Sequence, residues 1–289
     1  MTTLGFLGLG AMGGPMVRNL IRGGHGVVAF DPSFERLAAA ARDGAAAAGG
    51  ADDVVDRADA VLTSLPSSEA WVRLADETLV PGARAGQLFV DLGTVAPPET
   101  RRVAAALAAK GAALVDAPVS GGPRGAAEGS LYVFVGGEEE AVRRAWPILE
   151  VLGGHVRRCG PPGAGQIAKG VNQLAMGLGA AAYLEAVAFG VLAGLDAEAI
   201  GEAVGGPDGW RHHLAHTAER VARGRGNEIG VKFRELPYFL HEAAERGFEL
   251  PLTEALHRLL EPADRVVVDD NRPAPAYFHE LLRRRRGGG

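Results

Sequence analysis

Lysine is scarce in this sequence. Of its 30 lysine and arginine residues, only Lys110, Lys169 and Lys232 are lysines. Arginine keeps its proton in proteins, whereas a desolvated lysine can release it. A lysine retained in so arginine-rich a chain suggests a need for a titratable amine. The competing interpretation is the ordinary one, in which a lysine near a helix start is simply solvated.

The single cysteine, Cys159, and the net charge of −5 exclude several classes of protein. One cysteine cannot form an intramolecular disulfide, and the negative charge argues against a nucleic-acid binder or a basic membrane-surface protein. No targeting segment is evident. The most apolar window, residues 174–184, ends at Glu185, short of the roughly 20 residues that cross a bilayer. His212 and His216 lack a third ligand and are better interpreted as a solvated face than as a metal site. We expect a cytoplasmic protein without nucleic-acid, membrane or metal partners.

Glycine is abundant, with 42 residues, and several glycines form an ordered motif. Gly8, Gly10 and Gly13 follow a predicted strand at 4–7, and a second strand at 27–30 follows the helix they open. This is the context of a dinucleotide-binding turn, where the backbone approaches a pyrophosphate at a helix N-terminus. The alternative is a tight turn that caps a helix. The predicted cofactor-binding turn comprises Gly8, Leu9, Gly10, Ala11, Met12 and Gly13.

Asp31 bears on the choice of cofactor. It closes the second strand, 18 residues after Gly13, where a carboxylate binds the adenosine ribose hydroxyls. Such a carboxylate accepts from a free 2′-hydroxyl and repels a 2′-phosphate. Pro32 follows at a position where an arginine would favour the phosphate, although Arg36 lies one helical turn on. We predict NAD as the cofactor, with NADP possible.

Short apolar strands alternate with helical patterns as far as residue 162. This order predicts an α/β N-terminal domain, a Rossmann-like, doubly wound sheet over residues 1–162. Beyond Gly160-Pro161-Pro162-Gly163 the patterns are helical only, which predicts an all-α substrate and dimerisation domain over residues 163–289. The strands are expected at 4–7, 27–30, 60–64, 87–92, 113–119, 130–135 and 155–158. The helices are expected at 33–42, 54–57, 67–75, 97–110, 138–151, 163–194, 196–204, 210–223, 232–246, 252–260 and 276–285.

Two further stretches carry polar chemistry. On the long interdomain helix expected at 163–194, Lys169, Asn172 and Gln173 share one face of an otherwise apolar rod. This grouping suits a site that handles a proton better than it suits a packing face. Ser120-Gly121-Gly122 forms a corner at a strand's carboxyl end, where backbone N–H groups and a hydroxyl can converge on an anion. An ordinary turn is an equal alternative there.

Together these motifs resemble the β-hydroxyacid dehydrogenase family, whose members include 3-hydroxyisobutyrate dehydrogenase, tartronate semialdehyde reductase and 6-phosphogluconate dehydrogenase. GFLGLGAMGGPMVRNL resembles the family's cofactor signature, DAPVSGGPRGAAEGSL its substrate loop, and GAGQIAKGVNQ the start of its catalytic helix. PLTEAL and the closing D-x-N-x-P segment are also similar. The resemblance covers nearly the whole chain, and three ordered motifs are more specific than any one of them.

The resemblance implies roles for individual residues. Lys169 matches the catalytic lysine, and Asn172 would orient its amine and the substrate hydroxyl. Ser120-Gly121-Gly122 matches the loop that holds the substrate carboxylate, and Gln173 is implied to join substrate binding. The implied cofactor contacts outside the glycine turn are Leu65, Pro66, Thr94 and Arg234.

This sequence also departs from the family pattern. Gly93 stands where a serine usually precedes the threonine. Arg234-Glu235 falls where the family usually has Lys-Asp, in a segment whose lysine approaches the cofactor, and Lys232 is the alternative cation. These departures bear on the contacts that close over the cofactor and on the substrate, not on the chemistry.

The resemblance implies an NAD(P)-dependent oxidoreductase acting on a small 3-hydroxyacid, either 3-hydroxyisobutyrate-like or a tartronate or other semialdehyde. Lys169 would take the hydroxyl proton in oxidation and return it in reduction, and burial beside a positive nicotinamide ring would lower its pKa. The alternative is an imine reductase-like or non-catalytic NAD(P)-binding relative, in which this lysine is replaced. The apolar long helix and the resemblance together imply a homodimer or homotetramer.

Overall fold

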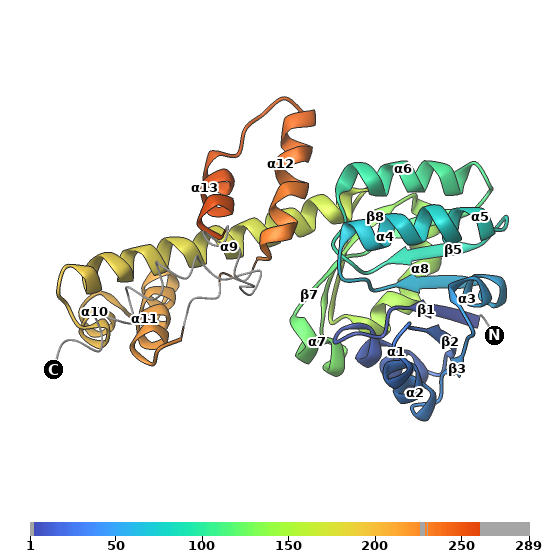
Figure 1. Ribbon diagram of the computed structural model, residues 1–289, viewed down its shortest axis with the longest axis horizontal. Helices are drawn as coiled ribbons and strands as arrows, with labels where there is room; N and C mark the ends of the chain where they lie inside the picture. Colours follow the sequence, from blue (N-terminus) through green and yellow to red (C-terminus); the bar gives the residue numbers. More distant parts are fainter. Residues whose placement is uncertain (1–2, 226–228, 230, 261–289) are drawn as a thin grey trace. The chain divides into compact units, whose positions relative to one another are not determined.

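The computed structural model describes residues 3–225, 229 and 231–260. The chain divides into two compact units, residues 1–169 and 170–289 (Figure 1). The division falls inside helix α9 (Ala164–Leu192), which begins in the first unit and continues in the second. The sequence-based boundary, between residues 162 and 163, is separated from the first residue of this helix by Gly163 alone.

The first unit is built on one nine-stranded sheet among the described residues. The spatial order is β3-β2-β1-β4-β5-β6-β8-β7, with β9 beside β8. Strands β1 to β6 form parallel pairs, and β8 runs antiparallel to β6 and β7. This order confirms the predicted doubly wound α/β fold. The strands are β1 (Thr3–Leu7), β2 (Gly26–Phe30), β3 (Ala46–Ala47), β4 (Ala60–Thr63), β5 (Leu88–Asp91), β6 (Ala113–Asp116), β7 (Val119–Ser120), β8 (Tyr132–Gly137) and β9 (His155–Gly160).

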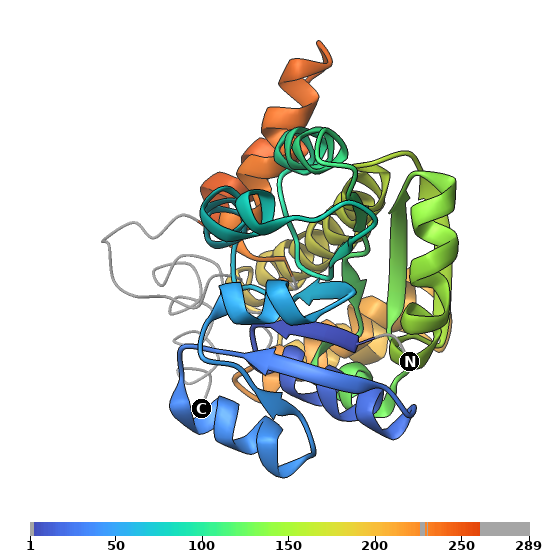
Figure 2. The same cartoon turned by 90° about the vertical axis from the view of Figure 1, so that its right-hand side faces the viewer.

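Helices cover both faces of the sheet (Figure 2). Met16 and Leu20 of α1 pack with Leu149 of α8 in the core on one face. Trp71 of α4 and Val103 of α6 belong to the core on the other face. Strands covered on both sides are apolar throughout, which is why they read as short continuous hydrophobic runs. The helices are α1 (Gly13–Arg22), α2 (Phe34–Arg42), α3 (Ala51–Arg57), α4 (Ser68–Leu74), a π-helical turn η1 (Ala75–Leu79), α5 (Val80–Gly82), α6 (Pro97–Ala108), α7 (Gly122–Glu128) and α8 (Glu139–Leu152).

The segment around the substrate-loop motif differs from the sequence-based expectation. The single strand expected at 113–119 is two strands, β6 and β7, because Pro118 has no N–H to give to a sheet ladder. Residues 122–128, for which no helix was predicted, form α7, with Pro123 in the first turn, where a missing N–H is tolerated. Ala46–Ala47, where no strand was predicted, forms the short edge strand β3.

The second unit is helical throughout its described residues, as predicted. Its core includes Leu184 and Val187 of α9, Leu214 of α11 and Leu256 of α13. The predicted helix at 232–246 begins as a 3-10 turn, and the expected helix at 276–285 lies outside the described residues, as does the D-x-N-x-P segment. The remaining elements are α10 (Ala197–Val204), α11 (Gly209–Ala222), η2 (Phe233–Glu235), α12 (Leu236–Glu245) and α13 (Pro251–Leu260).

Helix α9 is longer than the apolar window found in the sequence. It has 29 residues and, by length and composition only, is long and apolar enough to cross a membrane. The core helix of a soluble protein can meet the same test, and one third of its most apolar stretch (33%) is buried within this chain. The sequence-based argument that this segment is too short to span a bilayer is therefore wrong, and the absence of a membrane partner stays a prediction.

Candidate active site

The residues predicted to contact the cofactor from the first unit lie where parallel strands end. The glycine turn follows β1, Asp31 follows β2, Leu65 follows β4, and Thr94 follows β5. In open α/β sheets, ligands bind in the crevice beyond the carboxyl ends of the strands. A Cβ built on Gly93 would lie 3.6 Å from the carbonyl oxygen of Leu65, so the loops after β4 and β5 adjoin. The fold thus gathers these segments at one edge.

The glycine turn fits a dinucleotide. A Cβ on Gly13 would lie 1.9 Å from the carbonyl oxygen of Gly8, so only glycine allows the turn to close against the start of α1. Gly10 is different, since a Cβ there would meet no protein atom within 4 Å and its φ is not in the left-handed region. No contact with the residues that the structure describes requires a glycine at that position. Open space beside the backbone of Gly10 is what the close approach of a pyrophosphate requires.

Asp31 links this turn to the end of β2. Its Oδ2 accepts a hydrogen bond from the backbone N–H of Leu9 at 2.7 Å, and its Oδ1 accepts from the N–H of Ser33 at 2.8 Å. Nη1 of Arg36 lies 3.8 Å from Oδ2. The carboxylate is therefore structural as well as correctly placed for a ribose, because each oxygen keeps a second lone pair for a ligand hydroxyl.

Lys169 lies in the second turn of α9, and its side chain is turned toward the substrate-loop motif. The residue is only 7% exposed. Its Nζ donates to the carbonyl oxygen of Val119 at 2.9 Å. Val119 precedes Ser120 in β7, and Gly121 and Gly122 follow with φ values of +128° and +63°, which side chains rarely adopt. The structure thus places the predicted catalytic amine beside the predicted carboxylate loop.

Two buried carboxylates lie beside the first turn of α9, and the sequence interpretation missed both. Asp91 and Asp116 end neighbouring parallel strands and are paired in register. Asp91 accepts from the hydroxyl of Thr63 at 2.9 Å and from the N–H of Gly93 at 3.1 Å. Burial raises the pKa of Asp91 to about 8 and that of Asp116 to about 6, against the opposing effect of their hydrogen bonds. The repeated pattern of three apolar residues and an aspartate, LFVD and ALVD, is the signal that marks them.

Both carboxylates reach the first turn of α9. Asp116 accepts from the backbone N–H of Gly163 at 2.8 Å and of Gln166 at 3.0 Å. The Gln166 side chain donates to Oδ2 of Asp91 at 3.2 Å and to the carbonyl of Gly93 at 3.0 Å. The helix that carries Lys169 is thereby fastened to the ends of β5 and β6.

In the second unit, the two predicted amides join a buried glutamate. Gln173 Nε2 donates to Oε2 of Glu235 at 2.5 Å, and Asn172 Nδ2 donates to Oε1 of Gln173 at 3.3 Å. Gln173 and Glu235 are both buried. The amide of Gln173 is thus held by Glu235, at the position where the sequence resemblance predicts aspartate. A substrate-binding role for Gln173 stays a prediction.

The remaining candidates are less constrained. Arg234 lies in η2, and Lys232 precedes that turn. Both side chains are exposed, and this exposure does not distinguish between them. That Arg234 rather than Lys232 approaches the cofactor stays a prediction. Within the described part of the chain there is no group of three or more His, Cys, Asp or Glu that could hold a metal ion. His216, one of the two histidines considered for a metal, lies with Nδ1 3.9 Å from a carboxylate oxygen of Glu219.

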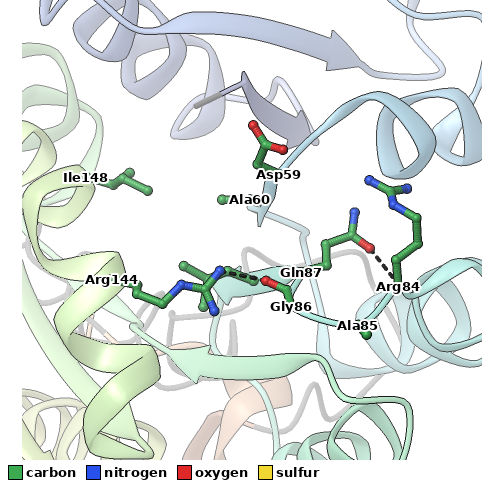
Figure 3. Close-up of a pocket in the computed structure, with 9 residues that line it drawn as sticks. Asp59, Ala60, Arg84, Ala85, Gly86, Gln87, Arg144 and Ile148 are labelled. Atoms are coloured by element: carbon green, nitrogen blue, oxygen red, sulfur yellow. Dashed lines mark hydrogen bonds between the residues drawn. The ribbon is translucent and has the colours of Figure 1, made fainter. Parts of the chain in front are cut away.

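A separate cavity of about 450 Å³ opens at the opposite edge of the sheet, where β4 and β5 begin (Figure 3). Its polar groups already have partners. Arg144 Nη2 donates to the carbonyl of Gly86 at 2.7 Å, Arg84 donates to two backbone carbonyls, and Asp59 accepts from the N–H of Thr3. This satisfied lining, at the amino ends of the strands, gives no reason to place the chemistry there.

Comparison with known proteins assigns the chain to a family. Residues 3–160 match the NAD binding domain of 6-phosphogluconate dehydrogenase, and residues 163–273 match the family described as NAD-binding of NADP-dependent 3-hydroxyisobutyrate dehydrogenase. Pseudomonas aeruginosa 3-hydroxyisobutyrate dehydrogenase is 41% identical over 204 residues, 70% of this chain and 68% of that protein. An NAD-dependent L-serine dehydrogenase of the same organism is 39% identical over the same shares. The solved structure of Mycobacterium tuberculosis 3-hydroxyisobutyrate dehydrogenase with L-serine has a TM-score of 0.81 and 32% identity, covering 97% of this chain and 99% of that one.

The fold and the glycine turn define a Rossmann-type oxidoreductase that binds NAD(P). The chain belongs to the 3-hydroxyisobutyrate dehydrogenase family of hydroxyacid dehydrogenases, which confirms the family predicted from the sequence motifs.

The two buried aspartates make stability depend on pH. Because the pKa of Asp91 is raised from 3.8 to about 8, the folded state holds the proton that the unfolded state releases. The associated stabilisation is present at low pH and is lost as the pH rises through the folded-state pKa. We expect the free energy of unfolding of the wild type to fall relative to that of Asp91→Asn from about pH 5 to about pH 9 in urea titrations. Asp53→Asn is the control, because a backbone hydrogen bond from Gly49 lowers the pKa of that exposed aspartate. Parallel pH profiles for the wild type and Asp91→Asn would contradict this assignment.

Proposed function

We propose that the protein transfers hydride between NAD(P) and a small 3-hydroxyacid, with Lys169 as the general acid and base. The observation that carries the proposal is the buried amine of Lys169, held 2.9 Å from the carbonyl of Val119 and next to Ser120. A buried amine releases its proton more readily than a solvated one, because burial disfavours the charged form. Burial distinguishes Lys169 from Lys110, whose amine also donates to a backbone carbonyl but lies on the surface.

The residues divide the work as follows. Ser120 and the backbone of Gly121-Gly122 hold the substrate carboxylate, which directs the 3-hydroxyl to Lys169. Lys169 Nζ accepts the hydroxyl proton as the alcohol is oxidised and donates it back as the carbonyl is reduced. Asn172 orients the hydroxyl. A bound nicotinamide supplies or accepts the hydride.

The sequence identities to named relatives do not distinguish between their substrates. The two P. aeruginosa relatives, named for 3-hydroxyisobutyrate and for L-serine, are 41% and 39% identical to this chain. Both named substrates are small carboxylic acids with a hydroxyl on carbon 3, so they share the chemistry that the site would recognise. We assign the substrate to this class, 3-hydroxyisobutyrate-like or a tartronate or other semialdehyde in the reducing direction.

A panel of substrates tests the proposal. Purified protein is assayed by absorbance of the reduced cofactor with 3-hydroxyisobutyrate, L-serine, glycerate and matching semialdehydes, with NAD and with NADP. Cyclic imines are included, because an imine reductase is the alternative. We expect turnover with at least one 3-hydroxyacid and none with the imines. Tight cofactor binding with no turnover would identify a non-catalytic relative instead.

Replacement of Lys169 by alanine separates catalysis from cofactor binding. We expect kcat to fall by about 100-fold to 10,000-fold, because one general acid and base is lost, while the affinity for NAD changes little. Lys110→Ala is the matched control, since its Nζ also donates to a backbone carbonyl, that of Pro81 at 2.7 Å, but on the surface. Turnover and cofactor affinity are measured for both variants. Equal losses of both in Lys169→Ala would show a structural lysine.

Asp31 sets the preference for NAD in this proposal, although one matched family is described as NADP-dependent. Its carboxylate would accept from the 2′-hydroxyl of NAD and repel the 2′-phosphate of NADP. We expect Asp31→Asn to lower the ratio of kcat/KM for NAD to that for NADP by about tenfold, because the repulsion is removed while one amide oxygen still accepts a hydrogen bond. The ratio is obtained from initial rates with each cofactor. An unchanged ratio would leave Asp31 with only its structural bonds to Leu9 and Ser33.

We propose that the protein is a cytoplasmic homodimer or homotetramer, and the apolar surface of α9 supports the assembly. Val171 and Phe189 on this helix are 66% and 77% exposed in the single chain. Large exposed apolar side chains on one long helix favour association with a second copy.

Light scattering coupled to gel filtration tests this assembly. We expect the wild type to elute as a dimer or tetramer and Phe189→Glu to shift toward smaller species, because the charge would be buried in the interface. Phe34→Glu is the control, since Phe34 is 82% exposed on α2 of the first unit. A monomeric wild type would remove this part of the proposal.

A further inference from the structure

The first turn of α9 is held by groups that are distant in the sequence. An exposed helix is usually capped by its own N-cap side chain. Here the cap is the carboxylate of Asp116 in the sheet, which accepts from the N–H groups of Gly163 and Gln166, 47 and 50 residues away. Gln166 is fully buried and adds bonds of its own to β5 and the loop that follows.

The packing leaves this turn very little freedom. A Cβ on Gly165 would lie 2.4 Å from the carbonyl oxygen of Phe134 and 2.6 Å from that of Asp116. A Cβ on Gly136 of β8 would lie 2.5 Å from Oδ1 of Asp116. The backbone of the first turn of α9 therefore packs directly against the backbone of β6 and β8, and the Asp116 carboxylate fills the remaining space.

Stability alone does not explain this arrangement. Taking a carboxylate out of water costs several kcal/mol in real proteins, and a hydrogen bond to a charged group returns about 1.5–3 kcal/mol. The geometry also bears on Lys169. Asp116 is three residues before Val119, whose carbonyl oxygen accepts the hydrogen bond from the Lys169 amine. One short segment thus fixes both the start of the helix and the end of the lysine side chain.

Gln166 extends the same restraint to the cofactor side. Its Oε1 accepts from the N–H of Val95 at 3.0 Å, and its Nε2 donates to the carbonyl of Gly93. These two residues flank Thr94, the predicted contact near the nicotinamide. We call residues 93–95 the cofactor loop. Gln166 and Lys169 are three residues apart and lie on adjacent turns of α9, so the cofactor loop and the amine are both attached to one rigid element.

We propose that Asp116 and Gln166 are positioning residues, which hold the first turn of α9 so that Lys169 meets the substrate loop and the cofactor loop at a fixed distance. This inference rests on the proposed role of Lys169. Neither residue touches the reacting atoms. Their replacement shifts the amine away from its near-attack position, and a misplacement of about 1 Å is enough to slow catalysis by about 100-fold.

The test uses Asp116→Asn in the full chain. The amide keeps one acceptor for the two N–H groups and turns its NH2 toward the other. We expect kcat to fall by about tenfold to 100-fold, while the stoichiometry and affinity of NAD binding stay near those of the wild type. The pH profile of kcat should also move to higher pH, because a displaced Lys169 is better solvated. Gln166→Met, which removes the bonds to Gly93 and Val95 but keeps the side-chain volume, should lower kcat in the same range.

Asp196→Asn is the matched control. Asp196 caps α10 by accepting from the N–H groups of Glu198 and Ala199, and α10 carries no proposed site residue. The same chemical change there should leave kcat and its pH profile unaltered. Thermal unfolding of all variants separates loss of folded protein from loss of rate.

The outcomes distinguish the two levels of the account. If Lys169→Ala collapses turnover but Asp116→Asn and Gln166→Met keep the wild-type kcat and pH profile, the positioning role is wrong and the proposed function stands. It is equally wrong if each variant loses turnover only in proportion to the NAD-binding protein that remains folded. If Lys169→Ala keeps wild-type turnover, the proposed function fails first.

Discussion

The carboxylate of Asp116 is the contact on which the arrangement of the site depends. It lies at the end of β6 and accepts the two N–H groups that open α9. Without it, the helix would meet the sheet with unsatisfied backbone donors in a buried place. With it, the register of the helix against the sheet is fixed, and Lys169 is carried to the carbonyl of Val119 one turn later.

Around this contact the fold separates two tasks. The parallel strands and the glycine turn form the edge at which other doubly wound sheets bind their cofactors. The irregular segment after β6 forms the side of the site that we propose for the substrate. Pro118 ends the ladder there, and the left-handed conformations of Gly121 and Gly122 turn the chain back. Gln166 bonds to the loop after β5, and Asp116 holds the N-terminus of the helix, so the sheet supports both sides of the site.

Much of the fold was accessible from sequence, because buried parallel strands are short apolar runs and a glycine turn has strict requirements. Gly13 illustrates this, since its Cβ would collide with the carbonyl of Gly8. The network around Asp91 and Asp116 was not accessible, because the pairing of β5 with β6 joins residues 25 positions apart. The bond from Gln173 to Glu235 spans 62 positions and depends on how the helices of the second unit pack. Helix α7 was missed because glycine and proline, which usually signal turns, also start helices.

The central claim is that Lys169 acts as an acid and base because it is buried, and the scarcity of lysine allows a direct measurement. With three lysines in the chain, NMR of protein labelled at the lysine side chains gives a spectrum simple enough to assign by the signal lost in Lys169→Arg. Titration of that signal, with NAD bound, reports the ionisation of the amine itself. The account predicts a pKa clearly below the value of about 10.4 for free lysine. A pKa at or above that value would contradict it.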